Sequence, residues 1–254
     1  MSKWALITGA SAGIGYELAK LFAADHFDLA LVARNEKRLN ELAGELQGRH
    51  GIATKVIPRD LSNPAAPAEI FEALRETPIS ILVNNAGFGS RAAFAQDPLP
   101  RSLEMMRLNM DALVALTHLF VQPMLSRREG RILNLASTAA FQPGPLMAIY
   151  YASKAFVFSF SVALAGELAG TGVTVTTLCP GPTRTEFQAR AGLKRSLGWL
   201  QMMTAEDVAR IGYRALMKGK PIVIPGGMNK ITSTIARCLP ARVTARFVRK
   251  LNQA

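Results

Sequence analysis

Seven short apolar runs, separated by stretches of helical periodicity, constrain the fold of this chain more than any other feature. The runs are WALIT (4–8), DLALVA (28–33), TKVI (54–57), ISILVN (79–84), RILNLAS (131–137), VTVTTLC (173–179) and PIVI (221–224). Between them apolar residues recur every three or four positions, as at Leu39, Leu42 and Leu46. Near-continuous apolar strands that alternate with helices are typical of a parallel sheet covered on both faces. The pattern predicts an α/β fold, a single doubly wound Rossmann-type domain of about seven strands.

The TGASAGIG loop at 8–15 directly follows the first apolar run and opens the first helical pattern. Its glycines permit a tight turn, and the helix N-terminus offers free N–H groups and a positive dipole end to a pyrophosphate. The spacing is GxxxGxG and not the G-x-G-x-x-G of the dinucleotide fingerprint, so a purely structural glycine turn is the alternative. The residues expected to bind a dinucleotide here are Gly9, Ser11, Gly13, Ile14 and Gly15.

The residue that follows the second strand indicates which dinucleotide the chain prefers. NAD-binding folds place an acid about 20 residues beyond the glycine loop, where it holds the ribose 2′-hydroxyl. Here the strand ends in Ala33 and Arg34, and the first carboxylate is Glu36. The planar fork of an arginine suits a 2′-phosphate. We therefore expect NADP(H) rather than NAD(H), the alternative being that Arg34 is a solvated loop residue.

Further motifs follow in order along the chain. They are Asp60-Leu61 after the third strand, NNAG at 84–87, Asn109, Ser137, the YxxxK of Tyr150 and Lys154, and PGPTRT at 180–185. Together with the glycine loop, this ordered set resembles the short-chain dehydrogenase/reductase family over about residues 3–225. The resemblance implies an oxidoreductase that transfers a hydride between a nicotinamide and a carbonyl or alcohol.

The resemblance also implies where the cofactor lies. Asp60 and Leu61 would border the adenine, Asn85, Ala86 and Gly87 would line the cleft after the fourth strand, and Pro180, Gly181 and Thr183 would lie at the nicotinamide end. Taken without the resemblance, NNAG and PGPT are turns, and the family itself uses part of NNAG to stabilise the sheet.

The stretch IYYASKAF at 149–156 holds two candidate tyrosines near one lysine. A free tyrosine has a pKa near 10, and a neighbouring ammonium is expected to lower it. Helix geometry permits either Tyr150 or Tyr151 to face Lys154. The family pattern selects Tyr150 as the general acid and base. Its separation from Ser137 along the sequence is also the one that the family commonly shows. By resemblance, Ser137 would hydrogen-bond the substrate carbonyl, Lys154 would also hold the nicotinamide ribose, and Asn109 would position a water for proton relay.

Apolar residues near these motifs predict an apolar ketone or aldehyde as the substrate. They are Phe88, Phe141, Pro143, Leu146, Met147, Phe187, Leu193, Leu197, Trp199, Leu200, Met202 and Met203. The alternative is that many of them fill the core or an interface. Two other functions stay open: a non-catalytic dinucleotide-binding sensor, and a membrane-associated assembly protein.

The length of 254 residues suits one domain. We expect residues 1–225 to form the dinucleotide-binding catalytic domain, with a lid over 183–203, and residues 226–254 to form a basic helical extension of it. Long patternless segments such as this lid are usually functional. By resemblance, the helices around 101–125 and 148–168 would make the subunit contacts of a homodimer or homotetramer.

Residues 228–254 carry six cations and no acid, half of the net charge of +12. The cations are Lys230, Arg237, Arg242, Arg246, Arg249 and Lys250. Ile231, Ile235, Leu239, Val243, Phe247 and Leu251 recur every four residues among them, with a break at Pro240. Two interpretations stay open: peripheral contact with an anionic membrane, or packing on the same or a neighbouring subunit. Nucleic acid is not expected as a partner, because the chain shows no recognised binding motif.

Other features argue against secretion, membrane insertion and metal binding. The N-terminus lacks the apolar core of a signal peptide, and the most apolar segment, 155–166, is shorter than the roughly 20 residues that span a bilayer. We therefore expect a cytoplasmic protein, in contact with a membrane only at its periphery if at all. Cys179 and Cys238 have no CxxC spacing and the chain has only three histidines, so no disulfide or metal site is expected. Cys179 ends an apolar run and is expected in the core.

Overall fold

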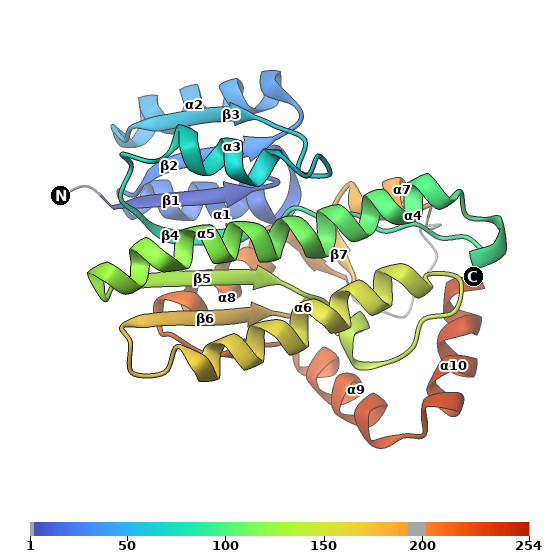
Figure 1. Cartoon of the computed structure of the whole chain (residues 1–254). Coiled ribbons are helices and arrows are strands. Elements are labelled where there is room, and N and C mark those ends of the chain that lie inside the picture. Colours follow the sequence, from blue (N-terminus) through green and yellow to red (C-terminus); the bar gives the residue numbers. More distant parts are fainter. Residues whose placement is uncertain (1–2, 193–201, 254) are drawn as a thin grey trace.

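The computed structural model describes residues 3–192 and 202–253. Within these residues, seven parallel strands form one sheet in the order β3-β2-β1-β4-β5-β6-β9 (Figure 1). The strands are β1 (Trp4–Thr8), β2 (Asp28–Ala33), β3 (Thr54–Pro58), β4 (Ile79–Asn84), β5 (Gly130–Leu135), β6 (Val173–Leu178) and β9 (Ile222–Val223). The predicted α/β class and the number of strands are confirmed. Because β1 pairs with both β2 and β4, the strand order reverses at β1, which is where such sheets bind ligands.

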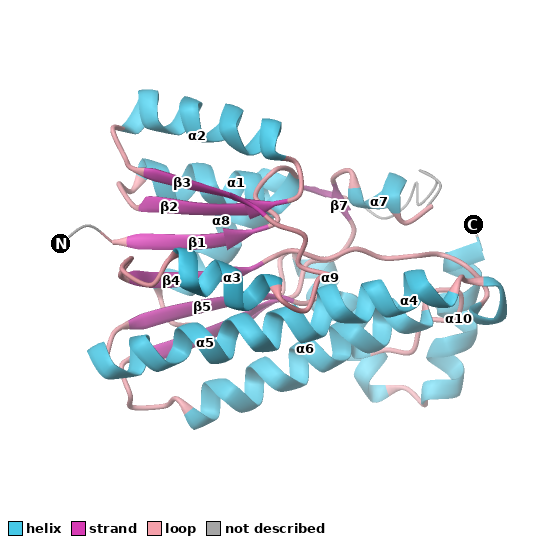
Figure 2. Ribbon diagram, turned by 45° about the horizontal axis from the view of Figure 1, so that its top comes forward, coloured by secondary structure: helices cyan, strands magenta, loops and turns pink. Residues whose placement is uncertain are grey.

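Two layers of helices cover the sheet, one on each face (Figure 2). On one face lie α1 (Gly13–Ala24), α2 (Glu36–His50) and α8 (Ala205–Met217). On the other lie α3 (Ala66–Ala73), α5 (Ala112–Arg127) and α6 (Ala148–Glu167). The core divides accordingly, and Leu18, Phe22 and Leu39 pack on the first face while Ile70, Leu116 and Phe120 pack on the second. Strands buried on both faces are the reason that the runs are apolar throughout and do not alternate.

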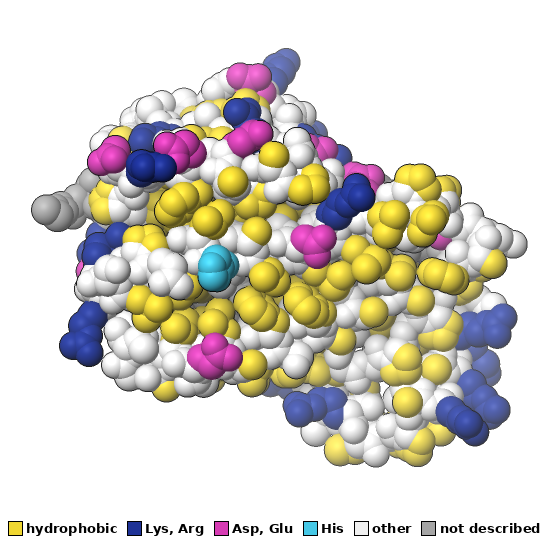
Figure 3. All heavy atoms as spheres, viewed as in Figure 1, with side chains coloured by type: hydrophobic (Ala, Val, Ile, Leu, Met, Phe, Trp, Pro, Cys, Tyr) yellow, Lys and Arg dark blue, Asp and Glu magenta, His cyan; other side chains and the backbone are white. Residues whose placement is uncertain are grey.

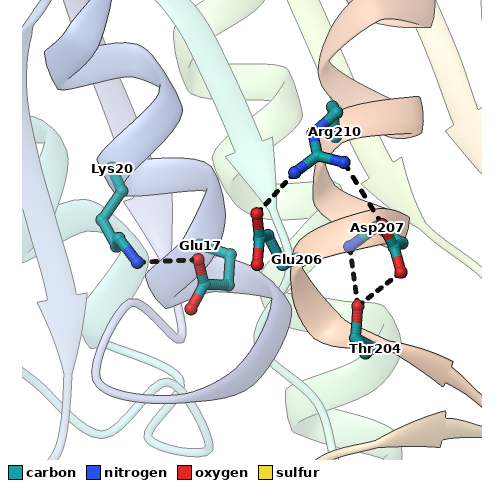
Figure 4. Close-up of polar contacts among 6 residues, drawn as sticks. All are labelled: Glu17, Lys20, Thr204, Glu206, Asp207 and Arg210. Atoms are coloured by element: carbon teal, nitrogen blue, oxygen red, sulfur yellow. Dashed lines mark hydrogen bonds and ion pairs between the residues drawn. The ribbon is translucent and has the colours of Figure 1, made fainter.

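Local sequence explains where the helices of the first layer begin. Asn35 caps α2 by accepting a hydrogen bond from the Arg38 N–H at 3.0 Å. Thr204 caps α8 in the same way, with the Asp207 N–H as its donor at 3.1 Å. Figure 4 shows this cap together with Arg210, which pairs with acids of the first turn of α8, and the separate Glu17–Lys20 pair on α1. These caps fix where α2 and α8 begin.

The second layer contains two long apolar helices. One runs without a break from Leu99 to Arg127 through α4 (Leu99–Met106), the π-helical turn η2 (Arg107–Asp111) and α5. The other is α6, which contains the predicted apolar segment 155–166 but is 20 residues long. By length and composition alone, both helices could cross a membrane. This differs from the sequence analysis, which considered only residues 155–166 and found that segment too short. In the structure, α5 packs on β4 and β5, and α6 packs on β6.

The segments that follow β6 add short elements at the carboxyl end of the sheet. The strands β7 (Thr183–Arg184) and β8 (Met203–Thr204) pair with each other, and α7 (Phe187–Arg190) lies between them. Of the predicted lid, Leu193, Leu197, Trp199 and Leu200 lie outside the described residues. After β9 come α9 (Gly227–Cys238) and α10 (Ala241–Gln253), and the predicted break at Pro240 falls between them. The remaining short turns are η1 (Phe94–Gln96) and η3 (Thr138–Phe141).

Candidate active site

The glycine loop forms a cradle between the end of β1 and the start of α1. Gly9 and Gly13 adopt positive φ angles of 65° and 61°, a region that favours glycine. A Cβ at Gly15 would lie 2.5 Å from the Gly9 carbonyl oxygen. No described side chain caps α1, whose N-cap is Ala12, and its first turn holds no acid. The free N–H groups and the positive helix end therefore fit a pyrophosphate.

The two other predicted members of this loop are placed differently. Ser11 lies half-buried in the turn before α1, whereas Ile14 packs into the core beneath it. A Cβ at Gly13 would lie 3.2 Å from Thr185 Cγ2, so the segment after β7 comes close to the loop. Part of the predicted lid thus contacts the phosphate cradle.

The NNAG turn is tied to the end of β1 by hydrogen bonds. The Thr8 hydroxyl donates to the Val83 carbonyl at 3.1 Å and accepts the N–H groups of Asn85 at 2.9 Å and Ala86 at 3.0 Å. Asn85 Nδ2 donates to the Thr8 carbonyl at 2.8 Å. Asn85 and Ala86 therefore hold the switch point of the sheet together, which agrees with the structural interpretation of this motif. A Cβ added at Gly87 would lie 2.9 Å from Asn109 Oδ1 and 3.5 Å from Lys154 Nζ.

Replacing Gly15 with alanine is expected to destabilise the protein by about 1–3 kcal/mol, because the new Cβ would lie 2.4 Å from Asn85 Nδ2. Gly48 on α2 is the matched control, since no described atom lies within 4 Å of a Cβ added there. Gly48→Ala is expected to stabilise by about 0.5–1 kcal/mol through helix propensity. Urea unfolding of both variants measures the difference, and equal stabilities would contradict the packing that is described here for the loop.

Arg34 follows β2 and lies between two carboxylates. Its Nη1 is 3.7 Å from Asp60 Oδ2 and 3.5 Å from Glu104 Oε1. Burial opposes ionisation of Asp60, but hydrogen bonds from Ser62 and the charge of Arg34 outweigh it and lower the pKa of Asp60. Leu61, expected beside the adenine, has its side chain buried in the core. Arg34, Asp60 and Glu104 thus form a cluster of partly exposed charges on this side of the switch point.

Arg38 is a further basic residue near the glycine loop, on the first turn of α2. Its Nη1 lies 2.8 Å from Glu186 Oε1, in the segment that follows β7. The strand-end rule that selected Arg34 misses it, because Arg38 lies one turn inside the helix that follows. The ion pair links the first turn of α2 to the predicted lid.

Ser137, Tyr150 and Lys154 come together beyond the carboxyl end of β5. Ser137 begins η3, and its hydroxyl oxygen accepts the Ala139 N–H at 3.1 Å. Tyr150 and Lys154 lie on successive turns of α6, and Lys154 Nζ is 5.9 Å from the centroid of the Tyr150 ring. The Tyr150 phenol is hydrogen-bonded to Ser137. Two elements that are adjacent in space thus bring the serine and the tyrosine into direct contact.

Burial dominates the ionisation of the tyrosine and the lysine. It raises the pKa of Tyr150 to about 12, against the opposing effect of the hydrogen bond to Ser137, and it lowers the pKa of Lys154 to about 8. The expected lowering of the tyrosine pKa by the ammonium is therefore not found. Lys154 Nζ donates to the Leu135 carbonyl at 2.8 Å, and desolvation is the largest cause of the shift in the phenol pKa. At neutral pH, Tyr150 is protonated and Lys154 is charged.

Asn109 lies in the π-helical turn, a feature that is frequent at functional sites. Its Oδ1 accepts the Phe88 N–H at 3.1 Å, and its Nδ2 donates to the Phe88 carbonyl at 3.0 Å and to Ser153 Oγ at 3.0 Å. Ser153 Oγ in turn donates to the Tyr150 carbonyl at 2.7 Å. Asn109 therefore connects the loop after NNAG to the helix that carries the tyrosine.

Tyr151 turns toward a different set of partners. Its ring lies against Gly144, where an added Cβ would be 2.2 Å from Tyr151 Cγ. Its hydroxyl is hydrogen-bonded to Asn252 of α10, and burial raises its pKa. The ring centroids of Tyr150 and Tyr151 are 6.0 Å apart in an edge-to-face arrangement. The structure thus separates the two phenols, which helix spacing alone leaves equivalent.

An apolar wall stands beside Tyr150. A Cβ on Gly89 would lie 2.8 Å from Phe187 Cζ, 3.3 Å from Met147 Cε and 3.3 Å from Tyr150 Cδ2. The ring centroids of Tyr150 and Phe187 are 5.3 Å apart. Of the predicted pocket residues, Phe187 therefore contacts the tyrosine, and Met147 lies with it around Gly89.

Other predicted pocket residues have different surroundings. Phe141 packs edge-to-face on Phe158 at 4.9 Å, and with Pro143 it lines a groove of about 370 Å³ that α9 borders. Met203 packs against the core of the first face. Leu146 adopts a φ of 69°, uncommon for a branched side chain, and its carbonyl accepts the Ala92 N–H at 2.9 Å. The alternative of core packing thus holds for Phe141 and Met203.

The PGPT segment closes the site beside β6. The Pro180 carbonyl accepts the Thr138 N–H at 2.9 Å, and the buried Thr183 hydroxyl donates to the Gly181 carbonyl at 2.9 Å. A Cβ on Gly181 would lie 2.4 Å from Asn229 Oδ1, so α9 packs tightly on this turn. Cys179, just before it, is buried in the core as expected.

Comparisons with known proteins agree with this geometry. Residues 3–196 match the family model described as short chain dehydrogenase. The very-long-chain 3-oxoacyl-CoA reductase of Anas platyrhynchos is 35% identical over 98% of this chain and 84% of its own length. The chain spans about half the length of the fungal proteins of that name that it matches.

Solved structures share the fold over nearly the whole chain. A short-chain dehydrogenase from Sphingobium yanoikuyae in complex with NADPH is 31% identical, with a TM-score of 0.83 over 94% of this chain and 97% of that one. A short-chain dehydrogenase/reductase from Burkholderia phymatum in complex with NAD is 25% identical, with a TM-score of 0.83 over 92% of both chains. The chain therefore belongs to the short-chain dehydrogenases, a family of oxidoreductases that bind a nicotinamide dinucleotide.

Proposed function

We propose that this oxidoreductase is an NADPH-dependent carbonyl reductase that acts on apolar ketones or aldehydes and uses Tyr150 as its general acid and base. The observation that carries the proposal is the contact between the Ser137 and Tyr150 side chains, with Lys154 beneath the tyrosine ring. A protonated phenol and a hydroxyl that converge on one point can both donate to a carbonyl oxygen.

Each residue then has a defined task. When bound, the nicotinamide supplies the hydride. Ser137 and Tyr150 hold the carbonyl oxygen, and Tyr150 gives it a proton. The charged Lys154 would bind the ribose hydroxyls of the bound cofactor. Asn109, joined to Phe88 and Ser153, keeps the surrounding backbone in place and positions a water that returns the proton.

The remaining predicted residues would hold the rest of the dinucleotide. Gly9, Gly13 and Gly15 present the first turn of α1 to the pyrophosphate. Asp60 faces the adenosine, and Thr183 lies at the nicotinamide end. The cradle that an added Cβ would fill supports this assignment.

Apolar residues beside the tyrosine support the proposed substrate class. Phe187 and Met147 pack at Gly89 next to the Tyr150 ring, so a carbonyl that reached the phenol would lie against apolar surface. Relatives named as very-long-chain 3-oxoacyl-CoA reductase and 17-beta-hydroxysteroid dehydrogenase type 3 are in keeping with this.

Arg34→Leu is expected to raise the KM for NADPH about 10- to 100-fold, because a charge-assisted hydrogen bond to the 2′-phosphate would be lost. The KM for NADH is expected to change less than about threefold, since NADH lacks that phosphate. Arg49→Leu, on the exposed far end of α2, is the control. Equal changes for both cofactors would remove the basis for the NADP(H) preference.

The reaction itself is tested by a spectrophotometric screen of NADPH and NADH consumption against a chemically diverse carbonyl panel. We expect NADPH consumption with apolar ketones or aldehydes. A clear preference for small polar carbonyls would contradict the proposed substrate class. Binding of NADPH without turnover of any carbonyl would favour the non-catalytic sensor instead.

We also propose a homodimer or homotetramer in which α5 and α6 make the subunit contacts. Phe156 and Val162 on α6 are 41% and 36% exposed, and Phe156 stacks on Phe160 at the surface. Figure 3 shows a broad apolar band over these helices. Such a patch on a soluble protein marks an interaction site.

A further inference from the structure

Helices α9 and α10 expose apolar side chains and bury polar ones. The exposed side chains are Met228 (65%), Ile231 (56%), Ile235 (52%), Leu239 (44%), Val243 (51%) and Phe247 (56%). The buried side chains of the two helices are the polar Ser233, Thr244 and Asn252 and one apolar residue, Val248. A surface helix normally turns its apolar stripe toward the core, so this inversion indicates that the outward face contacts something other than water.

We call the exposed apolar residues of this helix pair the α9–α10 face. On α9, Met228, Ile231 and Ile235 have the spacing of one helix face, and on α10 Val243 and Phe247 do the same. On α10, Arg246 and Lys250 flank the apolar stripe at the same helical spacing. Figure 3 shows the basic side chains gathered over α10 and beside α9, next to apolar atoms.

Contacts with the rest of the protein hold this face in place. Asn252 Nδ2 donates to the Pro145 carbonyl at 2.8 Å, and the Arg237 guanidinium lies 5.7 Å from the centroid of the Phe141 ring. Asn229 Nδ2 donates to the Pro225 carbonyl at 2.7 Å, and the same side chain packs on Gly181. The polar side of the helix pair is thus anchored beside the candidate active site, while its apolar side chains are exposed. Figure 1 shows the two helices at the edge of the molecule, beyond the end of α6.

We propose that the α9–α10 face docks on the surface of a membrane that contains anionic lipids. Residues 228–254 carry six cations and no acid, and among the described residues none of these cations is in an ion pair. Anionic headgroups complement the charge, while the acyl boundary receives the apolar side chains. The 226–254 extension is then the membrane-contacting part of the domain.

Two other binding partners would match either the apolar side chains or the charge of this surface, but not both. A second copy in a two-fold contact would set two clusters of like charge against each other. A nucleic acid would neutralise the cations but would leave Ile231, Ile235 and Phe247 in water. The membrane proposal does not depend on the proposed carbonyl reduction, because it rests on residues outside that site.

The test is co-sedimentation of the full chain with vesicles of phosphatidylglycerol and phosphatidylcholine, and with vesicles of phosphatidylcholine alone. We expect binding to the anionic vesicles at low salt and its release at high salt. Arg242→Gln, Arg246→Gln, Arg249→Gln and Lys250→Gln combined are expected to weaken binding at least 100-fold. Ile235→Glu with Phe247→Glu is expected to abolish it, because acids would replace the inserted apolar groups.

Matched controls carry the same changes at other exposed positions. Arg49→Gln, Arg214→Gln, Lys218→Gln and Lys220→Gln remove the same charge, and Phe94→Glu with Leu99→Glu add the same acids. Both controls are expected to sediment more strongly with anionic vesicles than their partner variants. The proposal is overturned if the wild-type chain does not bind anionic vesicles at low salt, or if each control loses binding as far as its partner. Loss of an oligomer in the Ile235/Phe247 variant, without vesicle binding by the wild type, would assign the face to a second copy.

Discussion

Tyr150→Phe is expected to lower kcat/KM for carbonyl reduction about 100- to 10,000-fold, the range that one general acid contributes. The substitution removes only the hydroxyl, which is hydrogen-bonded to Ser137, and keeps the ring that packs beside Phe187. Cofactor binding and stability should therefore change little while proton transfer is lost. NADPH oxidation with a carbonyl substrate accepted in the screen measures the effect.

Tyr151→Phe is the matched control for this prediction. Its hydroxyl is hydrogen-bonded to Asn252, away from Ser137, so we expect activity within about threefold of the wild type. Full activity in the Tyr150 variant would refute the assignment of the acid. Equal losses in both variants would mean that the pair acts through packing and not through one phenol.

Lys154→Met is expected to abolish most activity and to raise stability at neutral pH. Burial lowers the pKa of Lys154 to about 8, so at pH below this value the folded protein bears the cost of a buried ammonium. Relief of that cost is expected to add on the order of 2–3 kcal/mol to the free energy of unfolding. The same change removes the charge proposed to hold the ribose, and kcat/KM should fall by about 100-fold or more.

The stability gain should depend on pH in a defined direction. Between the folded pKa of about 8 and the usual lysine pKa, the unfolded wild-type chain binds more protons than the folded one. Wild-type stability therefore rises with pH across this window, and the advantage of the Met variant narrows. Urea unfolding at neutral and at alkaline pH measures both values, with the exposed Lys220→Met as the control. An advantage that stays constant with pH would contradict a buried charge at Lys154.

Much of the fold could be predicted because its signals are local. β1, β2 and β4 span the predicted residues, since a strand buried on both faces needs an uninterrupted apolar run. The break at Pro240 was predicted for a similar reason, because proline cannot continue a helix. The glycine loop was predicted because strand, glycines and helix follow one another directly.

Other features depend on segments that are distant in the chain. The strands β7 and β8 have two residues each and lie at the two ends of the segment that connects them. Strands this short leave no periodic signal in the sequence. Phe141 was assigned to the pocket from its place between Ser137 and Tyr150, yet Phe158 and Arg237 turn it into the core and toward α9. The residues around 193–201 lie outside the described part, so this portion of the lid remains a prediction.

The amino-acid sequence by itself determined the layered α/β architecture, the position of the phosphate cradle and the order of the candidate catalytic residues, because each depends on side chains close together in the chain. Only the tertiary structure decided which of the two tyrosines contacts Ser137, and that burial, and not the charge of Lys154, governs the phenol. It also decided that the apolar stripe of α9 and α10 faces outward. Desolvation and exposure are set by all the atoms packed around a group, and residues as distant as Asn252 and Pro145 are brought together only by the folded chain.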